Sequence, residues 1–436
     1  MRIVTKNYVL KKIFISDVNK NYLKWFSDKK IKKFVDSSPK TIQCLRSYVK
    51  EVNADPNTFF WGIFKNQKHI GNIKIFEINY KKKIGRLGIL IGDQKYRNIG
   101  IGKEIIEATK KFLIKKNILE LWLGVEKNNF AAINSYKKCG FLKFKSNKKY
   151  IYMKCDLITS KMIIGGAQLN SNYGITNFRN KTQSKSETSK IINNLRIKNL
   201  MHIDGAECYK FFRNDEINIL KNFKIDSKIF LENISDYNKL KIYFIKKYLH
   251  KNIKIETLFI HDGDNIFKNS YKKKLMILKK LKKEKIISKI GISIYNLTIL
   301  NRIISKLNVD VVQLPYNLVD RRIENFRNII SKSRIEIYAR SIFLQGSLLK
   351  KVKEIKNLAT IYEKVRKFTK KNNQSNLELS LNFVLNNDLV DKIIVGVRNS
   401  QEIDKLINYK FVRKKIKIKF TKNEKNFAYN PSKWKQ

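Results

Sequence analysis

The feature that most constrains this chain is a series of apolar, β-branched runs between residues 163 and 398, each followed by a polar or helix-like stretch. Hydrophobicity within each run is continuous rather than alternating, as in parallel strands that are covered by helices. The runs span residues 163–168, 200–205, 225–231, 257–262, 287–293, 309–316, 334–341 and 392–398. Eight such strands, separated by helices, predict a closed (β/α)8 TIM barrel.

The residues before about 158 follow a different pattern. Short apolar strands surround a Gly-rich turn and two helical stretches, which predicts a mixed-sheet α+β domain. The expected strands lie at 59–65, 69–78, 85–93, 120–126 and in the residues up to 157. We therefore expect one domain at 1–158 and the barrel at 161–412. The basic C-terminal tail at 413–436 is either a docking segment or a frayed end.

Composition excludes several classes of protein. A length of 436 residues indicates about two to three domains, and 43% hydrophobic residues are enough to bury real cores. No run of about 18 apolar residues is present, so no membrane span is predicted, and the first residues lack the apolar region of a secretory signal. The four cysteines, Cys44, Cys139, Cys155 and Cys208, have no metal-ligand spacing. They predict a cytoplasmic protein without a metal site.

The charge balance is strongly basic, since 93 Lys and Arg against 36 Asp and Glu give +57. Such a balance normally suggests nucleic-acid binding. The lysines, however, are spread along nearly every amphipathic segment, and Lys, Asn and Ile share A/T-rich codons. We therefore expect no nucleic-acid partner, and only a general attraction to anionic small molecules such as nucleotide phosphates.

A loop of small residues, Arg97–Gly102, lies between an expected strand and an expected helix. Such a loop lets backbone N–H groups and a helix N-terminus face a pyrophosphate. Alone it is equally compatible with an ordinary strand-to-helix turn. It is not a Walker loop, because no GK[ST] follows, and its single G-x-G is not a dinucleotide fingerprint.

Two motifs together resemble the GNAT acetyltransferase superfamily. The acyl-CoA loop R/Q-x-x-G-x-G/A is matched by Arg97, Gly100 and Gly102. A second signature is approximated by Asn129, Ala132, Tyr136, Gly140 and Phe141. The resemblance implies acetyl-CoA as co-substrate, bound through Arg97, Gly100, Gly102 and Asn129. It also implies a strand Leu87–Ile91 that splays around pantetheine, and Tyr136 as the acid for the leaving thiolate.

The base that takes the amine proton stays open between Glu77 and Glu126, which lie on plausible strands. Within the superfamily, YLKWFSDKKIKKFV and HIGNIKIFEI resemble the branch that acetylates amino sugars in surface-polysaccharide and flagellin-modification pathways. Acetyltransferases of protein N-termini share the same architecture, so they remain the alternative.

Four polar residues stand where a barrel places its chemistry. Asp204 ends the second expected strand, Lys228 lies in the third and His261 ends the fourth, while Tyr209 follows in a loop. A lysine ammonium lowers the pKa of a nearby tyrosine, and a carboxylate keeps that lysine charged and oriented. A histidine would orient a carbonyl oxygen. The group therefore suits protonation of an alkoxide as a hydride arrives.

These residues resemble the aldo-keto reductase family, as do the segments GGAQLNSNYGITN, GISIY, VVQLPYNLVDRR and RSIFLQGSLL, over roughly residues 161–410. The resemblance implies NADPH, with Ser293 and Gln313 on the carboxamide and Gly396 and Arg398 near the 2′-phosphate. Two departures stand out: Ile294 replaces the usual asparagine, and Arg340 replaces the aromatic that usually stacks on nicotinamide.

The sequence therefore predicts a bifunctional enzyme. We expect an N-acetyltransferase fused to an NADPH-dependent aldo-keto reductase, acting on small molecules in surface-glycan biosynthesis. One alternative is a ribosomal-type protein acetyltransferase fused to a reductase. Another is a non-catalytic, cofactor-binding regulatory subunit. A homo-oligomer is compatible with the sequence.

Overall fold

The structure is a computed structural model that describes residues 2–5, 7–33, 38–169, 171, 184–213, 215–268, 271–409, 411–412, 416–429 and 434. The chain divides into two compact units, Met1–Ser160 and Lys161–Gln436. Parts of two expected segments lie outside the described residues: 170 and 172–177 of GGAQLNSNYGITN, and 413–415, 430–433 and 435–436 of the basic tail. No described helix is long and apolar enough to cross a membrane.

The N-terminal unit is built on an eight-stranded sheet with the order β1-β2-β3-β4-β5-β6-β8-β7. The strands are β1 Arg2–Val4, β2 Val9–Lys12, β3 Phe59–Lys65, β4 Lys68–Asn79, β5 Ile84–Ile91, β6 Glu120–Glu126, β7 Leu142–Ser146 and β8 Tyr150–Asp156. The β3–β4 hairpin turns on Asn66 and Gln67, both at positive φ, as the twist of a tight hairpin requires. The mixed sheet predicted for this region is confirmed.

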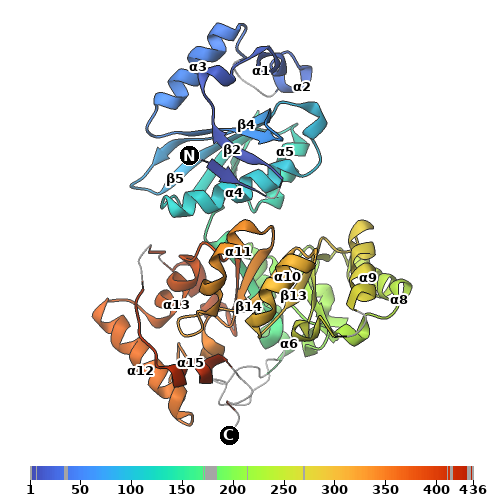
Figure 1. Cartoon of the computed structure of the whole chain (residues 1–436), viewed down its shortest axis with the longest axis vertical. Helices are drawn as coiled ribbons and strands as arrows, with labels where there is room; N and C mark the ends of the chain where they lie inside the picture. The colour runs from blue at the N-terminus through green and yellow to red at the C-terminus, as the bar shows by residue number, and fades with distance from the viewer. Residues whose placement is uncertain are drawn as a thin grey trace. The chain divides into compact units, whose positions relative to one another are not determined.

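Helices cover both sides of this sheet. They are α1 Lys20–Trp25, α2 Lys29–Lys32, α3 Ile42–Ala54, α4 Ile101–Lys115 and α5 Phe130–Lys138. Figure 1 shows α1–α3 on one side of the sheet and α4 on the other. Apolar side chains of α1 and α3, including Tyr22, Leu45 and Val49, form a buried cluster with Phe60 of β3.

Strands β5 and β6 are the one parallel pair of this sheet, and they pair only over Ile84–Arg86 with Glu120–Trp122. Beyond that point β5 continues beside β4, and β6 continues beside β8. The two strands therefore separate toward their C-terminal ends. The separation falls at Leu87–Ile91, where the sequence resemblance implied a splayed strand.

The C-terminal unit is a closed barrel of parallel strands in the order β10-β11-β12-β13-β14-β15-β16-β9. The strands are β9 Met162–Gly165, β10 His202–Asp204, β11 Lys224–Ile229, β12 Lys254–Ile260, β13 Lys289–Ser293, β14 Val311–Pro315, β15 Glu336–Arg340 and β16 Lys392–Gly396. Each lies within or overlaps one of the predicted apolar runs, so the barrel prediction is confirmed. The interior is packed, with Ile163, Phe259, Val311, Tyr338 and Ile394 in one buried cluster.

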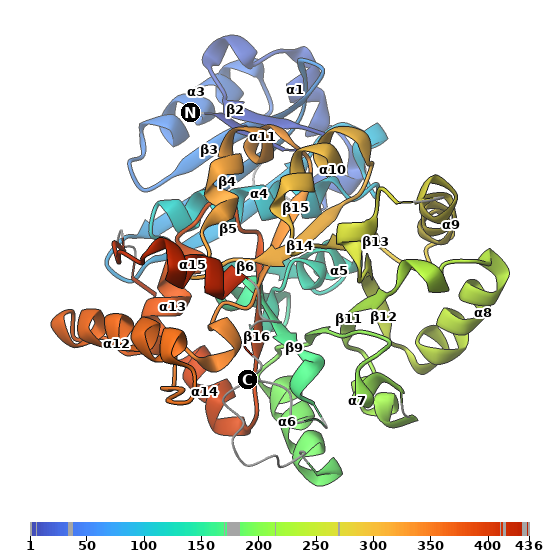
Figure 2. The same cartoon turned by 60° about the horizontal axis from the view of Figure 1, so that its bottom comes forward.

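Helices surround this barrel (Figure 2). They are α6 Lys185–Ile197, α7 Lys210–Arg213, α8 Tyr237–Lys247, α9 Tyr271–Lys283, α10 Leu300–Lys306, α11 Arg327–Lys332, α12 Lys356–Lys371, α13 Asn376–Leu385, α14 Ser400–Ile407 and α15 Lys422–Tyr429. Because the barrel interior is filled by side chains, polar chemistry is left to the C-terminal ends of the strands and the loops after them. We call this end of the barrel the mouth.

The described part of the basic tail is not a frayed end. Residues 422–429 form α15, which packs against α12. Glu424 of α15 pairs with Lys364 of α12 at 2.7 Å, and Phe420 and Trp434 are buried. The described residues of the tail therefore pack within the barrel unit.

Candidate active sites

Four polar side chains of the barrel come together at the mouth, as the sequence predicts. Lys228 Nζ lies 2.6 Å from both carboxylate oxygens of Asp204 and 3.0 Å from the carbonyl oxygen of Gly205. The same Nζ lies 5.7 Å from the centre of the Tyr209 ring. The rings of Tyr209 and His261 are 6.4 Å apart and nearly perpendicular.

Burial governs the electrostatics of this group. Lys228 and Asp204 are almost fully buried. Burial raises the pKa of Asp204, and the adjacent Lys228 ammonium opposes that effect. A buried ammonium that touches a carboxylate is held in position, because removing either partner would leave an uncompensated charge.

His261 is held in its neutral form. Burial lowers its pKa to about 4, and the positive charges of Lys228 and Arg340 contribute. Its ring stacks on Phe230 at 4.8 Å, and Cys208 Sγ lies 3.7 Å from its Nδ1. A neutral imidazole has one N–H donor, so it can orient a carbonyl oxygen without carrying charge.

Sequence reasoning missed Glu207, which fixes the loop between Asp204 and Tyr209. Its carboxylate accepts hydrogen bonds from Ser227 and Tyr248, both at 2.6 Å, and from Lys247 at 2.5 Å. Its backbone N–H donates to the carbonyl of Lys228. The only sequence signal was its place inside the D-G-A-E-C-Y segment, because its partners lie on β11 and at the end of α8.

Two residues that are expected to bind the carboxamide of the nicotinamide lie beside this group. Gln313 is fully buried on β14, and its Nε2 donates to Asp204 Oδ1 at 2.8 Å. Its Oε1 is buried without a hydrogen-bond partner. Ser293, also buried, is its neighbour across the β13–β14 pair. We call Asp204, Tyr209, Lys228 and His261 the tetrad. A buried acceptor without a partner next to the tetrad fits the amide N–H₂ of a nicotinamide cofactor.

The expected 2′-phosphate residues lie at the end of β16. Gly396 lies opposite Gly165 in the β16–β9 pair. A Cβ on Gly396 would overlap the side-chain oxygen Oε1 of Gln168, which is buried and has no hydrogen-bond partner. The Arg398 guanidinium contacts Glu402 Oε1 at 2.8 Å, on the first turn of α14. A phosphate here would therefore have to exchange with the Glu402 carboxylate.

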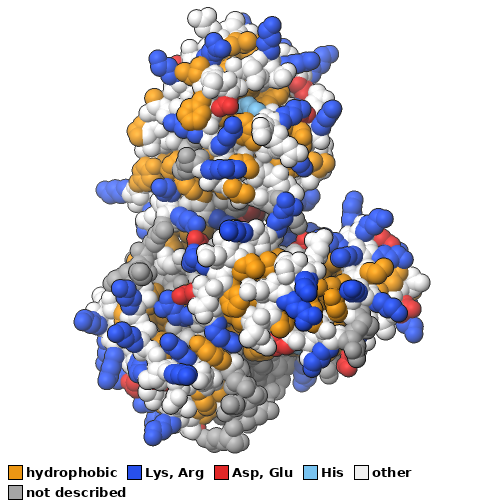
Figure 3. Space-filling model, in the orientation of Figure 1, with side chains coloured by type: hydrophobic (Ala, Val, Ile, Leu, Met, Phe, Trp, Pro, Cys, Tyr) orange, Lys and Arg blue, Asp and Glu red, His pale blue; other side chains and the backbone are white. Residues whose placement is uncertain are grey.

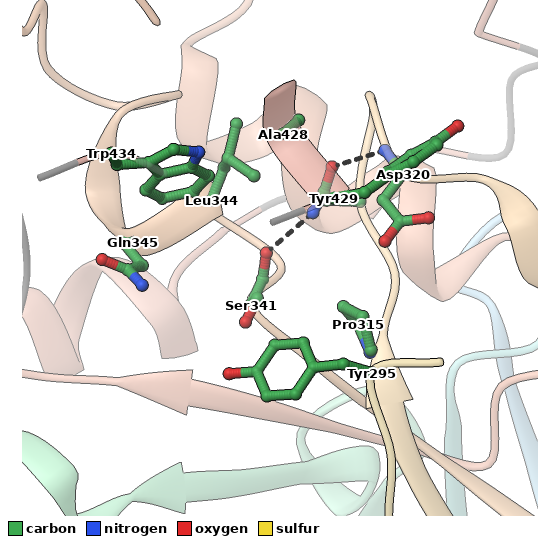
Figure 4. A pocket seen from close by; sticks show the side chains of 10 residues that line it. Tyr295, Pro315, Asp320, Ser341, Leu344, Gln345, Ala428, Tyr429 and Trp434 are labelled. Carbon is green, nitrogen blue, oxygen red and sulfur yellow. Dashed lines mark hydrogen bonds between the residues drawn. The ribbon is translucent and has the colours of Figure 1, made fainter. Parts of the chain in front are cut away.

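A small pocket opens beside the mouth. It lies between the loops after β13, β14 and β15 and the C-terminal segment, with Tyr295, Ser341, Leu344, Tyr429 and Trp434 among its lining residues (Figure 4). Buried Asn317 ties these loops together, since its side chain donates to the carbonyl of Ser341 and accepts from the N–H of Asp320.

In the N-terminal unit, the Arg97–Gly102 loop follows the separated strand β5. Gly100 has φ +88° at the start of α4, and no side chain caps this helix. The first N–H groups of α4 are therefore available to an anion at the helix N-terminus, where the helix dipole also favours negative charge. This geometry fits the pyrophosphate of a coenzyme A thioester.

The Arg97 side chain turns back into the protein. Its guanidinium donates to the carbonyls of Ile91 and Gly92 and pairs with Asp28 at 2.6 Å. A Cβ on Gly92 would overlap the Trp25 ring. Arg97 therefore braces the loop from inside, which sequence reasoning did not foresee because Asp28 lies far away in the chain.

The second motif lies close to this loop. The Asn129 side chain caps α5 by accepting from the N–H of Ala132. A Cβ on Gly102 would come within 3.2 Å of Ser135 Oγ, so the start of α4 lies against the helix that carries Tyr136. Burial raises the pKa of Tyr136 to about 12. Its hydroxyl therefore keeps its proton at neutral pH, and burial alone makes it a weaker acid than a free phenol.

The two candidate bases are placed differently. Glu77, at φ +53° in a bulge of β4, pairs with Arg86 at 2.9 Å where β5 and β6 still touch. Glu126 ends β6 at the open side of the strand separation and pairs with Lys149 at 3.2 Å. Both glutamates therefore remain candidates for the base that takes the proton of the amine.

Cationic side chains form no single patch on the face that Figure 3 shows. Lys and Arg are scattered among hydrophobic and neutral side chains on both units. Among the described residues, no group of three or more His, Cys, Asp or Glu side chains gathers as a metal site.

Comparison with known proteins agrees with this division. The model of the acetyltransferase (GNAT) family matches residues 21–141, and that of the aldo/keto reductase family matches residues 161–419. A streptothricin acetyltransferase from Escherichia coli is 27% identical over 97 residues, which cover 22% of this chain and 54% of that protein. The chain thus spans about half the length of this curated relative.

Solved acetyltransferase structures are similar to part of this chain. A spermidine N-acetyltransferase from Vibrio cholerae, in complex with CoA and spermine, is 17% identical, with a TM-score of 0.32 over 35% of this chain and 97% of its own. A ribosomal-protein-S5-alanine acetyltransferase from Vibrio fischeri is 15% identical, with a TM-score of 0.33 over 36% and 96%.

The two families use acetyl-CoA and NADPH, respectively, as co-substrates, and both are enzyme families. The chain belongs to the aldo/keto reductase family through its barrel, and it carries a GNAT acetyltransferase domain ahead of that barrel.

Proposed function

We propose that the acetyltransferase unit N-acetylates a small amine, an amino sugar or a nucleotide-linked amino sugar, and that the barrel reduces a carbonyl with NADPH. The observation that carries the second half is the Asp204–Lys228 pair beneath Tyr209, with Lys228 Nζ 2.6 Å from the carboxylate and 5.7 Å from the tyrosine ring. We place both activities in one cytoplasmic pathway of surface-glycan biosynthesis, because a fusion is most useful when its products are consumed together.

In the reduction, NADPH, when bound at the mouth, would supply a hydride to the carbonyl carbon and become NADP⁺, while the C=O π pair moves to oxygen. Tyr209 gives its proton to that oxygen, and solvent returns it later. The Lys228 ammonium stabilises the resulting phenolate, and Asp204 holds the ammonium in place. His261, neutral because its pKa is lowered to about 4, donates its N–H to the same oxygen.

Ser293 and Gln313 are the residues that we assign to the carboxamide, since Gln313 Oε1 is buried and lacks a partner. Gly396 and Arg398 are assigned to the 2′-phosphate. A phosphate dianion can displace a single carboxylate from a guanidinium that is half exposed, as Arg398 is.

In the acetyl transfer, the amine attacks the thioester carbonyl, a C–N bond forms and the C–S bond breaks. Tyr136 protonates the departing sulfur, and Glu77 or Glu126 takes the proton of the amine. Gly88 and Gly124 lie where the strands separate. Because neither has a Cβ, each leaves a space beside an aromatic ring, that of Phe76 and that of Tyr152, respectively. Tyr152, which lies opposite Gly124 across the β6–β8 pair, offers a flat surface on which a sugar ring can stack.

The test is a panel of amino sugars, nucleotide-linked amino sugars and N-terminal peptides of ribosomal proteins, with free thiol measured after addition of acetyl-CoA. Sugar turnover at least tenfold above peptide turnover supports the proposal. Peptide acetylation without sugar acetylation would favour the ribosomal-type alternative. In parallel, loss of NADPH absorbance with aldehydes and keto sugars tests the reductase. A folded protein that binds NADPH and oxidises it with none of them would be a regulatory subunit.

A further inference from the structure

Cys208 places a thiol at the mouth that the tetrad does not include. It lies in the loop after β10, directly before Tyr209, and its side chain is half-buried. Its Sγ lies 3.7 Å from Nδ1 of His261, within hydrogen-bonding distance for sulfur. The His261 ring also stacks on Phe230, with 4.8 Å between the ring centres. The structure therefore pairs an oriented imidazole with a thiol.

The loop that carries Cys208 is anchored immediately before the thiol. The backbone N–H of Glu207 donates to the carbonyl of Lys228 at 2.9 Å. The Glu207 carboxylate accepts a hydrogen bond from Ser227 Oγ at 2.6 Å, and Ser227 and Lys228 are neighbours on β11. Backbone and side-chain bonds to one strand leave the next residue little freedom. The backbone of Cys208 is therefore fixed in the position from which its thiol reaches His261.

His261 can assist the reduction in only one of its two neutral tautomers. Its pKa, lowered to about 4 mainly by burial, keeps the ring neutral at neutral pH. A neutral imidazole has one N–H donor, and its other nitrogen is an acceptor. Because Nδ1 faces Cys208, Nε2 is the nitrogen left for a carbonyl oxygen. With the proton on Nε2 the ring donates to that oxygen, and with the proton on Nδ1 the lone pair of Nε2 repels it.

The thiol favours the productive tautomer. A thiol is a stronger acid than the N–H of a neutral imidazole, and an imidazole nitrogen is a stronger base than a thiol sulfur, so the contact is stronger as S–H to Nδ1 than as Nδ1–H to sulfur. We propose that Cys208 is a positioning residue, which donates its S–H to Nδ1 of His261 and so keeps the ring N–H on Nε2 for the carbonyl oxygen. This inference rests on the proposed reductase function for its effect on turnover, but not for the tautomer itself.

The direct test is the tautomer of His261 in the full-length chain, measured by NMR after labelling of histidine with ¹⁵N. Protonated and unprotonated ring nitrogens give well-separated signals, and His261→Gln assigns those of His261 among the four histidines. In the wild type at neutral pH, the proton should reside on Nε2. Cys208→Ala should lower the ratio of that tautomer to the other by about 2- to 10-fold, the range of one hydrogen bond. Cys208→Ser should keep the wild-type signals, since its hydroxyl also donates.

Kinetics show whether the thiol acts through the histidine. With an aldehyde that the wild type reduces, Cys208→Ala should lower kcat by about 2- to 10-fold and leave KM for NADPH unchanged. Cys208→Ser should restore most of kcat. In a His261→Gln background, Cys208→Ala should cost nothing further, because the ring through which the thiol acts is gone. Cys44→Ala is the control, since Cys44 is an exposed cysteine on α3, and it should match the wild type.

The outcomes separate the two claims. A proton on Nδ1 of wild-type His261, or unchanged His261 signals in Cys208→Ala, overturns the proposal and leaves the reductase function standing. Equal kcat losses from Cys208→Ala in both backgrounds, or no loss in either, would likewise remove the positioning role, because the thiol would not act through the ring. If the wild type turns over no carbonyl compound, the reductase function fails, and the NMR measurement still decides whether Cys208 sets the tautomer.

Discussion

Tyr209 depends on its neighbours for its acidity. A phenol has a pKa of about 10 in water, so it is a poor proton donor at neutral pH. The ammonium of Lys228, fixed by Asp204 and the carbonyl of Gly205, is the group positioned to stabilise its anion. Glu207 holds the intervening loop against β11. The acid is therefore one phenol within a pre-organised network.

This arrangement predicts the behaviour of Tyr209→Phe, which removes only the hydroxyl. NADPH affinity should persist, while carbonyl reduction should fall by about 10²- to 10⁴-fold, the range expected for a positioned general acid. Steady-state kinetics and a fluorescence titration of NADPH check this. Tyr271→Phe, on α9 and packed against Phe267, is the control and should be neutral. Unchanged turnover in Tyr209→Phe would remove the residue from the mechanism.

His261 predicts a pH signature. Its pKa is lowered to about 4 by burial and by Lys228 and Arg340, so its NMR titration should fall near pH 4 rather than near 6.5. The unfolded chain takes up this proton near pH 6.5, so the free energy of unfolding should fall as pH drops from 6.5 to 4. His261→Gln should reduce that loss in urea melts at the two pH values. A titration of His261 near 6.5 would contradict the burial and charge argument.

At the scale of elements, local patterns of hydrophobic residues predicted much of the fold. The predicted strands at 59–65 and 120–126 coincide with β3 and β6, because continuous apolar residues between polar ends leave little choice. The eight strands of the barrel could be predicted from the sequence for the same reason. Helix α15 could not be predicted in this way, since its contacts with α12, including the ion pair with Lys364, join residues far apart in the sequence.

The candidate active sites could be predicted from the sequence only in part. The tetrad followed from strand ends, because every parallel strand of a barrel ends at the same mouth. The direction of individual side chains did not follow. Arg97 turns toward Asp28, and Arg398 contacts Glu402, because partners distant in sequence or across a helix turn compete for each guanidinium. The roles of Arg97, Gly100, Tyr136 and the carboxamide residues remain predictions.

The Gly100 loop yields an element-scale prediction. Gly100→Val would force a β-branched residue to φ +88°, so the start of α4 must shift and lose its alignment with an anion. Acetyl-CoA affinity should fall by at least about tenfold in calorimetry. Gly346→Val is the matched control, since Gly346 has φ +93° but lies in the barrel unit. It should cost similar stability and leave acetyl-CoA affinity within about threefold. Equal losses in both variants would indicate general strain rather than a binding loop.

At the scale of the molecule, the two units have separate sheets and separate cores. Each is longer than the size at which a single core becomes adequate, so residues 1–160 and 161–436 should each fold when expressed alone. Circular dichroism and cooperative thermal melts check this. If neither fragment melts cooperatively, the units depend on one another, and the fusion is structural as well as functional.

The central claim is that one chain carries two independent cofactor sites, one in each unit. Calorimetric titration of the full-length protein with acetyl-CoA and with NADPH, in both orders, tests it most directly. We predict one site for each ligand, with each affinity unchanged by the other ligand, because the loop before α4 and the mouth of the barrel belong to different units. Failure of either ligand to bind the folded protein, or competition between them for one site, would contradict the claim.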